Sequence, residues 1–438
     1  MYYLETATVE GFWGNHTVNL NLYKDVNFLI GVNGSGKTTF LNLIASTISG
    51  DLAGLLRFDF TRIILNFHSY KGTTKPSIEV IKCDDELNEN FSYKIKPKSS
   101  GKSIKFDFTY LIDPEDRFVA RALFRRTIRQ KNYTRNILQD HNSINDERYS
   151  LEQELAKIVS MSWLTVHRGG GKIRKSEKAF DSQVDEKLDE VTSRLIQYFG
   201  SLSNKSEKKS EEFQQDFLLQ ILFEKNDDHF VINDENIDVD SEKSSLYDIF
   251  DDFNIPKTKY EKKIDRHFKL LKESLDKLSN NDQKADISDY FTVVSARKFE
   301  KISEGWKGIR KDKENIFLPR DLFLKTINSM LNRKKIFLDN DNSFLFETQS
   351  GKLMGLNKLS SGEKQLFILL AESTLQKNEP FIYFADEPEI SLHVKWQNQI
   401  VIFLQKTNPN GQIVFATHSP DIVGQYSNNV HDMEKKVQ

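Results

Sequence analysis

Residues 31–38 of the chain read GVNGSGKT, and this stretch decides the fold. It follows the short apolar run from Val26 to Ile30 and precedes the helix-forming sequence FLNLIAST. The pattern G-x-x-x-x-G-K-[ST] between a strand and a helix predicts a loop whose backbone N–H groups surround a phosphate. The alternative is an ordinary glycine-rich turn, which the complete motif in this context disfavours. The predicted phosphate-binding residues are Gly31, Asn33, Gly34, Ser35, Gly36, Lys37, Thr38 and Thr39.

An acidic motif far along the chain predicts the second half of this site. Residues 381–393, FIYFADEPEISLH, begin as an apolar strand and reach two adjacent carboxylates. After a phosphate loop, this pattern predicts that Thr38 and Asp386 hold Mg²⁺, while Lys37 reaches the β- and γ-phosphates. Glu387 is then the candidate base that polarises the attacking water.

A third apolar strand, in IVFATHSP at residues 413–420, ends in His418. A loop histidine bound to the backbone is the plainer interpretation of a single histidine. Because this strand repeats the pattern of the acidic one, we favour a γ-phosphate sensor. The predicted catalytic residues are therefore Glu387, His418 and Lys37.

A second glycine-bearing turn, LSSGEKQ at residues 359–365, lies far from the phosphate loop in sequence. A free hydroxyl and a glycine before a helix are typical of an anion-binding site. The chain already has one such site for a triphosphate, so the repetition needs an explanation. The candidate residues of this turn are Leu359, Ser360, Ser361, Gly362 and Glu363.

The order of these motifs resembles that of the ABC-type ATPases, in which LSSGEKQ matches the signature motif. The resemblance implies ATP and Mg²⁺ as cofactors, and hydrolysis of ATP to ADP and phosphate. It also implies that two heads pair face to face, each signature turn capping the γ-phosphate held by the other head. ISLH at 390–393 occupies the D-loop position, with Ser391 and Leu392 as candidate residues. The expected assembly is a homodimer, or a higher homo-oligomer of dimers.

The motifs DEPEISLH and THSP and the long insertion resemble those of the Rad50/SMC/OLD branch of this family. Within it, the chain is similar to stand-alone ATPase subunits of bacterial anti-phage systems, of the PARIS (AriA) or Septu (PtuA) type. That resemblance implies an ATP-dependent sensor or scaffold that controls an effector, a nuclease supplied in trans, with a phage-derived trigger. The alternatives are a DNA repair or recombination ATPase of the Rad50/RecF kind, a transporter or ribosome-associated ABC protein, and a head that binds ATP mainly to assemble.

The chain departs from this family in two places. No glutamine precedes Gln130, so either Gln130 or a residue of another type takes the role of the usual Q-loop glutamine. The sequence given ends twenty residues after His418, which leaves no room for the Toprim nuclease domain of OLD proteins. We therefore expect any nuclease to be a separate protein.

The sequence favours an α/β fold: a P-loop ABC ATPase head, with a mixed sheet and flanking helices, carrying a large mainly helical insertion. We expect residues 1–112 and 290–438 to form the head and residues 113–289 to form the insertion, as a short helical hairpin. Strands are expected in 60–110, at Phe291 to Ser295, and in a hairpin over 334–348.

Composition limits the partners. The formal net charge of −2 gives no strong overall field, so DNA is a candidate partner that the charge does not favour. Residues 117–135, with Arg117, Arg121 and Arg125 on one helical face, could bind phosphate or an acidic protein, but a solvated basic face is favoured. Trp13 could stack on adenine, although a core position is favoured.

The single cysteine, Cys83, excludes an intramolecular disulfide. We find no signal-peptide pattern and no apolar stretch long enough to span a bilayer. We therefore expect a cytoplasmic protein without membrane contact.

Overall fold

The computed structural model of the chain divides into two compact units, which are described separately. The first comprises Met1–Ile196 and Leu322–Gln438, and the second comprises Gln197–Asp321. The structure describes residues 2–84, 88–98, 101–111, 143–163, 183–220, 239–253, 255–279, 286–339, 342–390 and 392–437.

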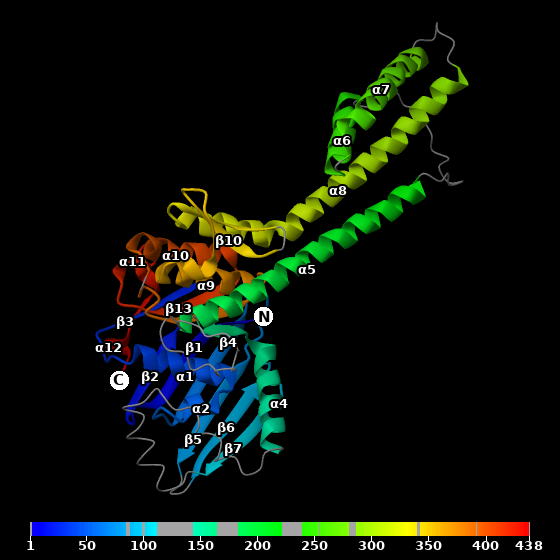
Figure 1. Cartoon of the computed structure of the whole chain (residues 1–438). Helices are drawn as coiled ribbons and strands as arrows, with labels where there is room; N and C mark the ends of the chain where they lie inside the picture. The colour runs from blue at the N-terminus through cyan, green and yellow to red at the C-terminus, as the bar shows by residue number, and fades with distance from the viewer. Residues whose placement is uncertain are drawn as a thin grey trace. The chain divides into compact units, whose positions relative to one another are not determined.

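The first unit contains a six-stranded antiparallel sheet with the order β2-β1-β4-β5-β6-β7 (Figure 1). Apolar side chains alternate along these strands, because successive residues of a strand point to opposite faces of the sheet. Ile63, Leu65 and Phe67 of β4 are fully buried. The strands are β1 (Tyr2–Phe12), β2 (His16–Asn21), β4 (Arg62–Ser69), β5 (Ser77–Asp84), β6 (Asn88–Lys96) and β7 (Ile104–Leu111).

A five-stranded parallel sheet with the order β14-β3-β13-β12-β8 positions the predicted site. Its central strands are almost wholly buried, as expected for a parallel sheet covered on both faces. The strands are β3 (Val26–Ile30), β8 (Met161–Trp163), β12 (Phe381–Asp386), β13 (Gly411–Ala416) and β14 (Val430–Asp432).

Helix α1 (Lys37–Ser49) packs between these two sheets, since it contacts β4 of one and β8, β12 and β13 of the other. One apolar core joins both sheets, α1 and α4 (Ser143–Ile158). Figure 1 shows α4 running beside the antiparallel sheet. The short helix α2 (Leu52–Leu55) follows α1.

Helices α9 (Ser361–Leu375) and α10 (Val394–Thr407) contact each other, and α10 also contacts β13. A small antiparallel sheet of β9 (Lys334–Leu338), β10 (Phe344–Thr348) and β11 (Leu353–Gly355) packs on α9 through the rings of Phe344 and Phe367. The remaining short elements are η2 (Leu356–Lys358), α11 (Pro420–Val423), η3 (Ser427–Asn429) and α12 (Met433–Lys436).

The second unit is helical in its described residues. It contains the later part of α5 (Gln183–Gln220), α6 (Val239–Asp252), α7 (Lys257–Ser279) and the earlier part of α8 (Ile287–Met330). Its buried core includes Tyr260, Ile264 and Phe268 of α7, which recur at the predicted helical spacing, and Trp306 of α8.

The structure corrects two expectations. Phe291 to Ser295 lies inside α8 and is not a strand; Val293 packs in the helical core there, while Phe291 is exposed. The units also divide at 196/197 and 321/322, not at the expected 112/113 and 289/290. Residues 143–163, expected in the insertion, supply α4 and the edge strand β8 to the first unit. Among the helices that the structure describes, none combines the length and apolar character of a membrane span.

Candidate active site

The site lies at the carboxyl edge of the parallel sheet, where β3, β12 and β13 end. Parallel pairing of β3 with β13 and of β13 with β12 places the ends of all three strands together. The phosphate loop follows β3, Asp386 ends β12 with Glu387 directly after it, and His418 lies just beyond β13. We call residues 31–39, 386–387 and 417–418 the phosphate edge.

The phosphate loop is a tight turn that only glycine fits at its last position. Gly36 has φ 90°, in the left-handed region, and a Cβ there would lie 2.9 Å from the Phe12 ring. The Lys37 ammonium donates hydrogen bonds to the carbonyl oxygens of Gly31 (2.8 Å) and Val32 (3.1 Å). Residues Asn33 and Gly34 are exposed, Ser35 is buried, and Thr39 is half-buried in the first turn of α1.

The loop and the acidic strand meet directly. The Thr38 hydroxyl donates a hydrogen bond of 3.0 Å to Oδ1 of Asp386, across 348 residues of sequence. Burial lowers the pKa of Lys37, and the carboxylates of Asp386 and Glu387 oppose this shift. Lys37 is only 5% exposed, and its ammonium is bonded to oxygens of the phosphate loop.

Glu387 lies in a backbone conformation that few residues other than glycine adopt. Its φ is 50°, and its N–H donates to the carbonyl oxygen of Ala416 at 2.8 Å. Such strain is typical of functional positions, because the surrounding structure must maintain it. Nε2 of His418 lies 3.8 Å from Oε1 of Glu387, so the two side chains predicted to act on the γ-phosphate are neighbours.

The signature turn, residues 359–363, is a capped helix start. Ser360 caps α9 by accepting from the N–H of Glu363, while Glu363 accepts from the N–H (2.8 Å) and the hydroxyl (2.8 Å) of Ser360. Leu359 and Gly362 are buried, and Ser361 is exposed. Within the described residues, no hydrogen bond or ion pair joins this turn to the phosphate edge.

Lys334 at the start of β9 holds the signature turn from the side. Its ammonium lies 2.7 Å from Oε2 and 3.0 Å from Oε1 of Glu363. Burial by itself raises the pKa of Glu363, but the hydrogen bonds from Lys334 and Ser360 outweigh it and lower that pKa. This pair was not predictable from the sequence, since a lysine near a strand is ordinarily a solvated residue.

Two further residues of the site escaped sequence reasoning. Oε1 of Glu434 in α12 accepts from the N–H of Val32 at 2.8 Å, so the end of the chain supports the phosphate loop. Oε1 of Glu389 accepts from the Thr417 hydroxyl and from the N–H of His418, each at 2.8 Å. The motif DEPE puts Glu389 close to Asp386 in sequence, but only the fold shows which groups Glu389 contacts.

Trp13 corrects another expectation, because it is not a core residue. It is 46% exposed, with φ 54° in the turn between β1 and β2. A Cβ at Gly36 would lie 3.0 Å from its indole, and its ring centroid is 4.7 Å from that of Phe12. An exposed aromatic ring therefore borders the phosphate loop.

Several predicted residues lie outside the described part of the chain. These are Gln130, the basic stretch 117–135 and Ser391 of the D-loop. Leu392 of the D-loop is buried, and its N–H donates to the carbonyl oxygen of Glu389 at 2.9 Å.

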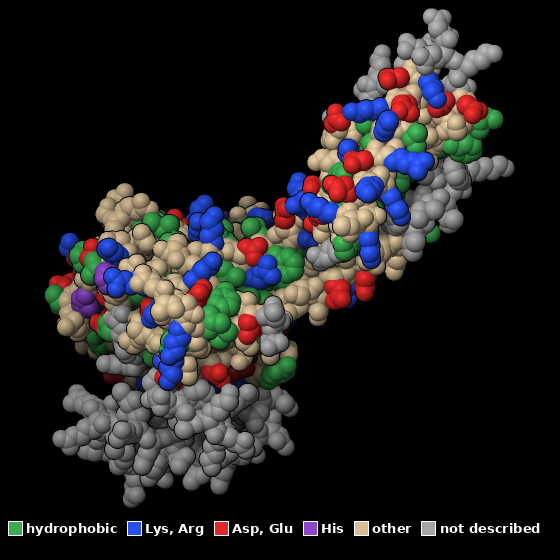
Figure 2. All heavy atoms as spheres, turned by 45° about the horizontal axis from the view of Figure 1, so that its top comes forward, with side chains coloured by type: hydrophobic (Ala, Val, Ile, Leu, Met, Phe, Trp, Pro, Cys, Tyr) green, Lys and Arg blue, Asp and Glu red, His purple; other side chains and the backbone are tan. Residues whose placement is uncertain are grey.

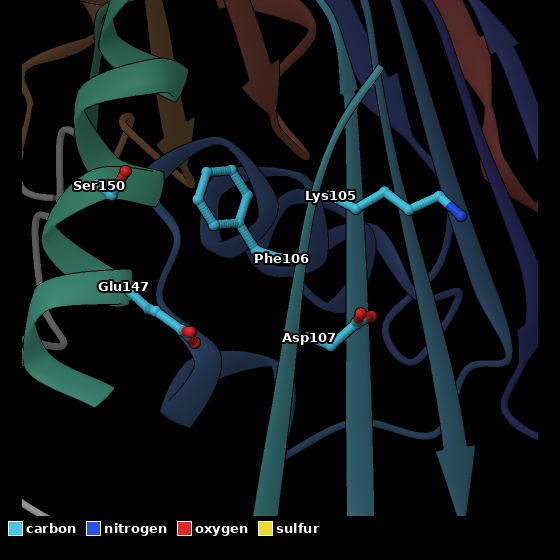
Figure 3. A pocket seen from close by; sticks show the side chains of 5 residues that line it. All are labelled: Lys105, Phe106, Asp107, Glu147 and Ser150. Carbon is cyan, nitrogen blue, oxygen red and sulfur yellow. The ribbon is translucent and has the colours of Figure 1, made fainter. Parts of the chain in front are cut away.

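A hollow of about 510 Å³ lies away from the phosphate edge, between β7 and α4 (Figure 3). Lys105, Phe106 and Asp107 line it from the strand, and Glu147 and Ser150 line it from the helix. All of these except Phe106 are exposed, so the hollow is a surface depression without an enclosed apolar wall.

The phosphate loop, the acidic strand end and the histidine loop at one sheet edge define a P-loop ATPase head with a helical insertion. The chain belongs to the family described as "AAA domain, putative AbiEii toxin, Type IV TA system", which matches residues 26–424.

Relatives and solved structures give further likenesses. The chain is 35% identical over 83 residues to the retron Vc95 probable ATPase of Vibrio cholerae serotype O1 biovar El Tor, a match that spans 16% of each chain. The Smc head domain of Pyrococcus furiosus, bound to the C-terminal domain of ScpA, aligns with 97% of this chain and 91% of its own length, at 14% identity and a TM-score of 0.40. The SMC head domain of Thermotoga maritima aligns with 96% and 91%, at 10% identity and a TM-score of 0.34.

Proposed function

We propose that this protein hydrolyses ATP at the phosphate edge, pairs head to head with a second copy, and acts as an ATP-dependent sensor or scaffold in anti-phage defence. The observation that carries the chemistry is the hydrogen bond between Thr38 and Asp386, with Glu387 and His418 beside it. These groups come from three strand ends, and together they supply the phosphate loop, the acidic pair and the histidine that ATP hydrolysis requires.

In this mechanism the loop N–H groups and Lys37 bind the phosphates of ATP. Glu387 orients a water molecule and takes a proton from it as the water oxygen attacks the γ-phosphorus. The bond from the γ-phosphorus to the bridging oxygen breaks, and ADP leaves with the bonding electrons. The proton then passes from Glu387 to the released phosphate, and His418 contacts the γ-phosphate as the sensor.

The side chains at this edge fit Mg²⁺. The Thr38 hydroxyl and the Asp386 carboxylate are hard oxygen donors 3.0 Å apart, next to the phosphate loop, which suits a cation that prefers oxygen ligands. When bound there, Mg²⁺ would neutralise charge that develops on the phosphate oxygens. Thr38 would supply its hydroxyl, and Asp386 would act through water.

The pairing is supported by the signature turn, which has no contact with the phosphate edge of its own head among the described residues. The turn starts α9, whose first N–H groups and dipole suit an anion. The γ-phosphate of ATP bound to a partner head would accept hydrogen bonds from this turn. The active form is then a homodimer, or a homo-oligomer of dimers.

We also propose that Trp13 contacts the base of the same nucleotide. Its exposed indole borders Gly36 of the phosphate loop. An aromatic ring in such a position offers stacking to adenine, which is favourable for any base.

The defence role is supported by the family's description as a putative AbiEii toxin of a Type IV TA system and by the likeness to a retron ATPase. We propose that an effector in trans, a nuclease, is held or released according to the nucleotide state, and that a phage product is the trigger. The PARIS and Septu types are the systems proposed for it.

DNA is the competing partner. Figure 2 shows basic and acidic side chains interspersed on the visible face of the second unit's described helices. That face does not favour DNA binding, because DNA binding requires clustered positive charge.

The test uses Glu387→Gln, with Glu347→Gln on β10 as the matched control. We expect Glu387→Gln to bind ATP, to lose about 10²- to 10⁴-fold in turnover and to accumulate as a dimer in size-exclusion chromatography with light scattering. Glu347→Gln should match the wild type. Full turnover in Glu387→Gln would refute the assignment of the base.

The partner is tested by purifying tagged Glu387→Gln protein co-expressed with its native neighbouring genes, followed by mass spectrometry and nucleic-acid staining. A stoichiometric protein encoded next to this chain supports the defence role. Bound DNA without a protein partner would favour the repair alternative.

A further inference from the structure

We propose that Glu389 is a positioning residue, which fixes His418 against Glu387 by joining the D-loop segment to the histidine loop. The D-loop segment is residues 387–393 without Ser391, and the histidine loop is residues 417–419. The proposal rests on the proposed ATP hydrolysis, because it concerns the same site.

The carboxylate of Glu389 holds the backbone of the histidine loop. Its Oε1 accepts from the Thr417 hydroxyl and from the N–H of His418, each at 2.8 Å. Hydrogen bonds to an ionised acceptor are stronger than those between neutral groups. Thr417 is fully buried, and its N–H donates to the carbonyl oxygen of Leu29 at 3.1 Å, so this loop is also fixed to the end of β3.

Gln397 of α10 makes the same connection from the other side. Its Nε2 donates to the carbonyl oxygens of Leu392 (3.0 Å) and Glu389 (3.4 Å). Its Oε1 accepts from the Ser419 hydroxyl at 2.8 Å. Two side chains therefore tie the D-loop segment to the histidine loop, and a displacement of one should move the other.

The other carboxylate oxygen suggests how Glu389 acts. Oε2 of Glu389 is buried and has no hydrogen-bond partner among the described residues. Burying an unsatisfied charged oxygen is unfavourable, so this oxygen by itself adds nothing to stability. Two mechanisms remain: Oε1 acts as an acceptor for the histidine loop, or the negative charge acts on Lys37, whose pKa is lowered by burial and partly restored by nearby carboxylates including Glu389.

Glutamine separates these mechanisms. The amide oxygen of Glu389→Gln can accept the same two hydrogen bonds but carries no charge. If Glu389 acts as a positioning acceptor, Glu389→Gln should function and Glu389→Ala should not. If it acts through charge, both variants should be impaired equally.

The experiment measures kcat and KM for ATP with Glu389→Ala, Glu389→Gln and, as the control outside the site, Glu347→Ala. We expect Glu389→Ala to lower kcat about 10- to 100-fold with KM within about twofold, since a misplaced group costs turnover more than binding. Glu389→Gln should recover most of kcat. An unchanged kcat in Glu389→Ala, or equal losses in both variants, would overturn the proposal.

Hydrogen exchange read by mass spectrometry adds a measurement that needs no nucleotide. The His418 amide is protected by Glu389, so exchange in peptides covering 411–420 should accelerate in Glu389→Ala and return to the wild-type rate in Glu389→Gln. Unchanged exchange in Glu389→Ala would overturn the positioning role whatever the activity. Wild-type protein without ATP turnover would instead refute the proposed function, while the exchange data would still decide the contact.

Gln397→Ala is the second variant if Glu389→Ala fails to fold. It removes the other connection without leaving a buried charge, so it should lower kcat in the same direction and accelerate exchange at Ser419. Gln397→Ala with wild-type kcat and exchange would contradict the coupling of the two loops.

Discussion

The phosphate edge and the signature turn both place polar groups at the start of a helix, yet they are built differently. The phosphate edge joins residues that lie hundreds of positions apart, as in the hydrogen bond from Thr38 to Asp386 across 348 positions. The signature turn is local, because Ser360 and Glu363 cap their own helix. The first site has its phosphate loop, acidic pair and histidine in one head, whereas the second offers an anion site that we propose a partner's nucleotide fills.

Removing the ammonium group of Lys37 should abolish ATP binding at the phosphate edge. Lys37→Ala should lower kcat/KM by about 10³-fold or more and abolish ATP binding, since one preorganised charge at the phosphates contributes strongly. Calorimetry and phosphate release measure the two quantities. Lys105→Ala on β7, far from the edge, is the control, and ATP binding retained in Lys37→Ala would contradict the assignment of the loop.

Mixing two inactive variants should show that the two sites belong to different copies. Lys37→Ala lacks a working phosphate loop, and Ser360→Arg places bulk and charge in the signature turn. A paired head has two composite sites, so an equal mixture should recover about a quarter of wild-type turnover through random pairing. Each variant alone should be inactive while its thermal unfolding remains cooperative. No recovery after mixing would argue that one head completes its own site.

Removing Lys334, which contacts Glu363 of the signature turn, should lower the stability of the protein more than its ATP turnover. Lys334→Met leaves the buried Glu363 carboxylate without its cation and should lower the free energy of unfolding by about 2 kcal/mol in urea titrations. Lys335→Met, its exposed neighbour on β9, is the matched control. An unchanged unfolding midpoint would mean that the pair adds nothing net.

The stabilisation by the Lys334–Glu363 pair should depend on pH in a predictable direction. Because the folded-state pKa of Glu363 lies below its ordinary value of 4.5, its stabilisation is fully present above that value and is lost as pH falls through the lowered pKa. In Lys334→Met the acid side of the stability profile should become shallower. A profile identical to that of the wild type would count against the assignment.

The smallest expected effect is that of replacing Trp13, whose ring borders the phosphate loop. Trp13→Ala should raise KM for ATP about tenfold and leave kcat unchanged, because stacking binds ground and transition states alike. Tyr23→Ala, another exposed aromatic, should have no effect. KM for GTP should rise similarly, because stacking tolerates any base, and an unchanged KM for ATP in Trp13→Ala would contradict the contact.

Much of this arrangement was predictable from the chain. The phosphate loop, the buried strands β3, β12 and β13, and the hairpin of β9 and β10 follow from short motifs and periodic burial. The helical character expected of the insertion agrees with α7, where apolar residues on one helical face repeat every three or four positions. Strand β8 was missed, since three residues are too few to show a period.

By itself, then, the sequence predicted a site made of Lys37, Asp386, Glu387 and His418, and it predicted that these residues end or follow strands of one kind. Only the tertiary structure decided their neighbours: Glu434 under the loop, Glu389 on the histidine loop and Lys334 on the signature turn. The physical reason is that periodicity reports which face of an element is buried. Hydrogen bonds between residues hundreds of positions apart depend on strand order and register, which local sequence does not encode.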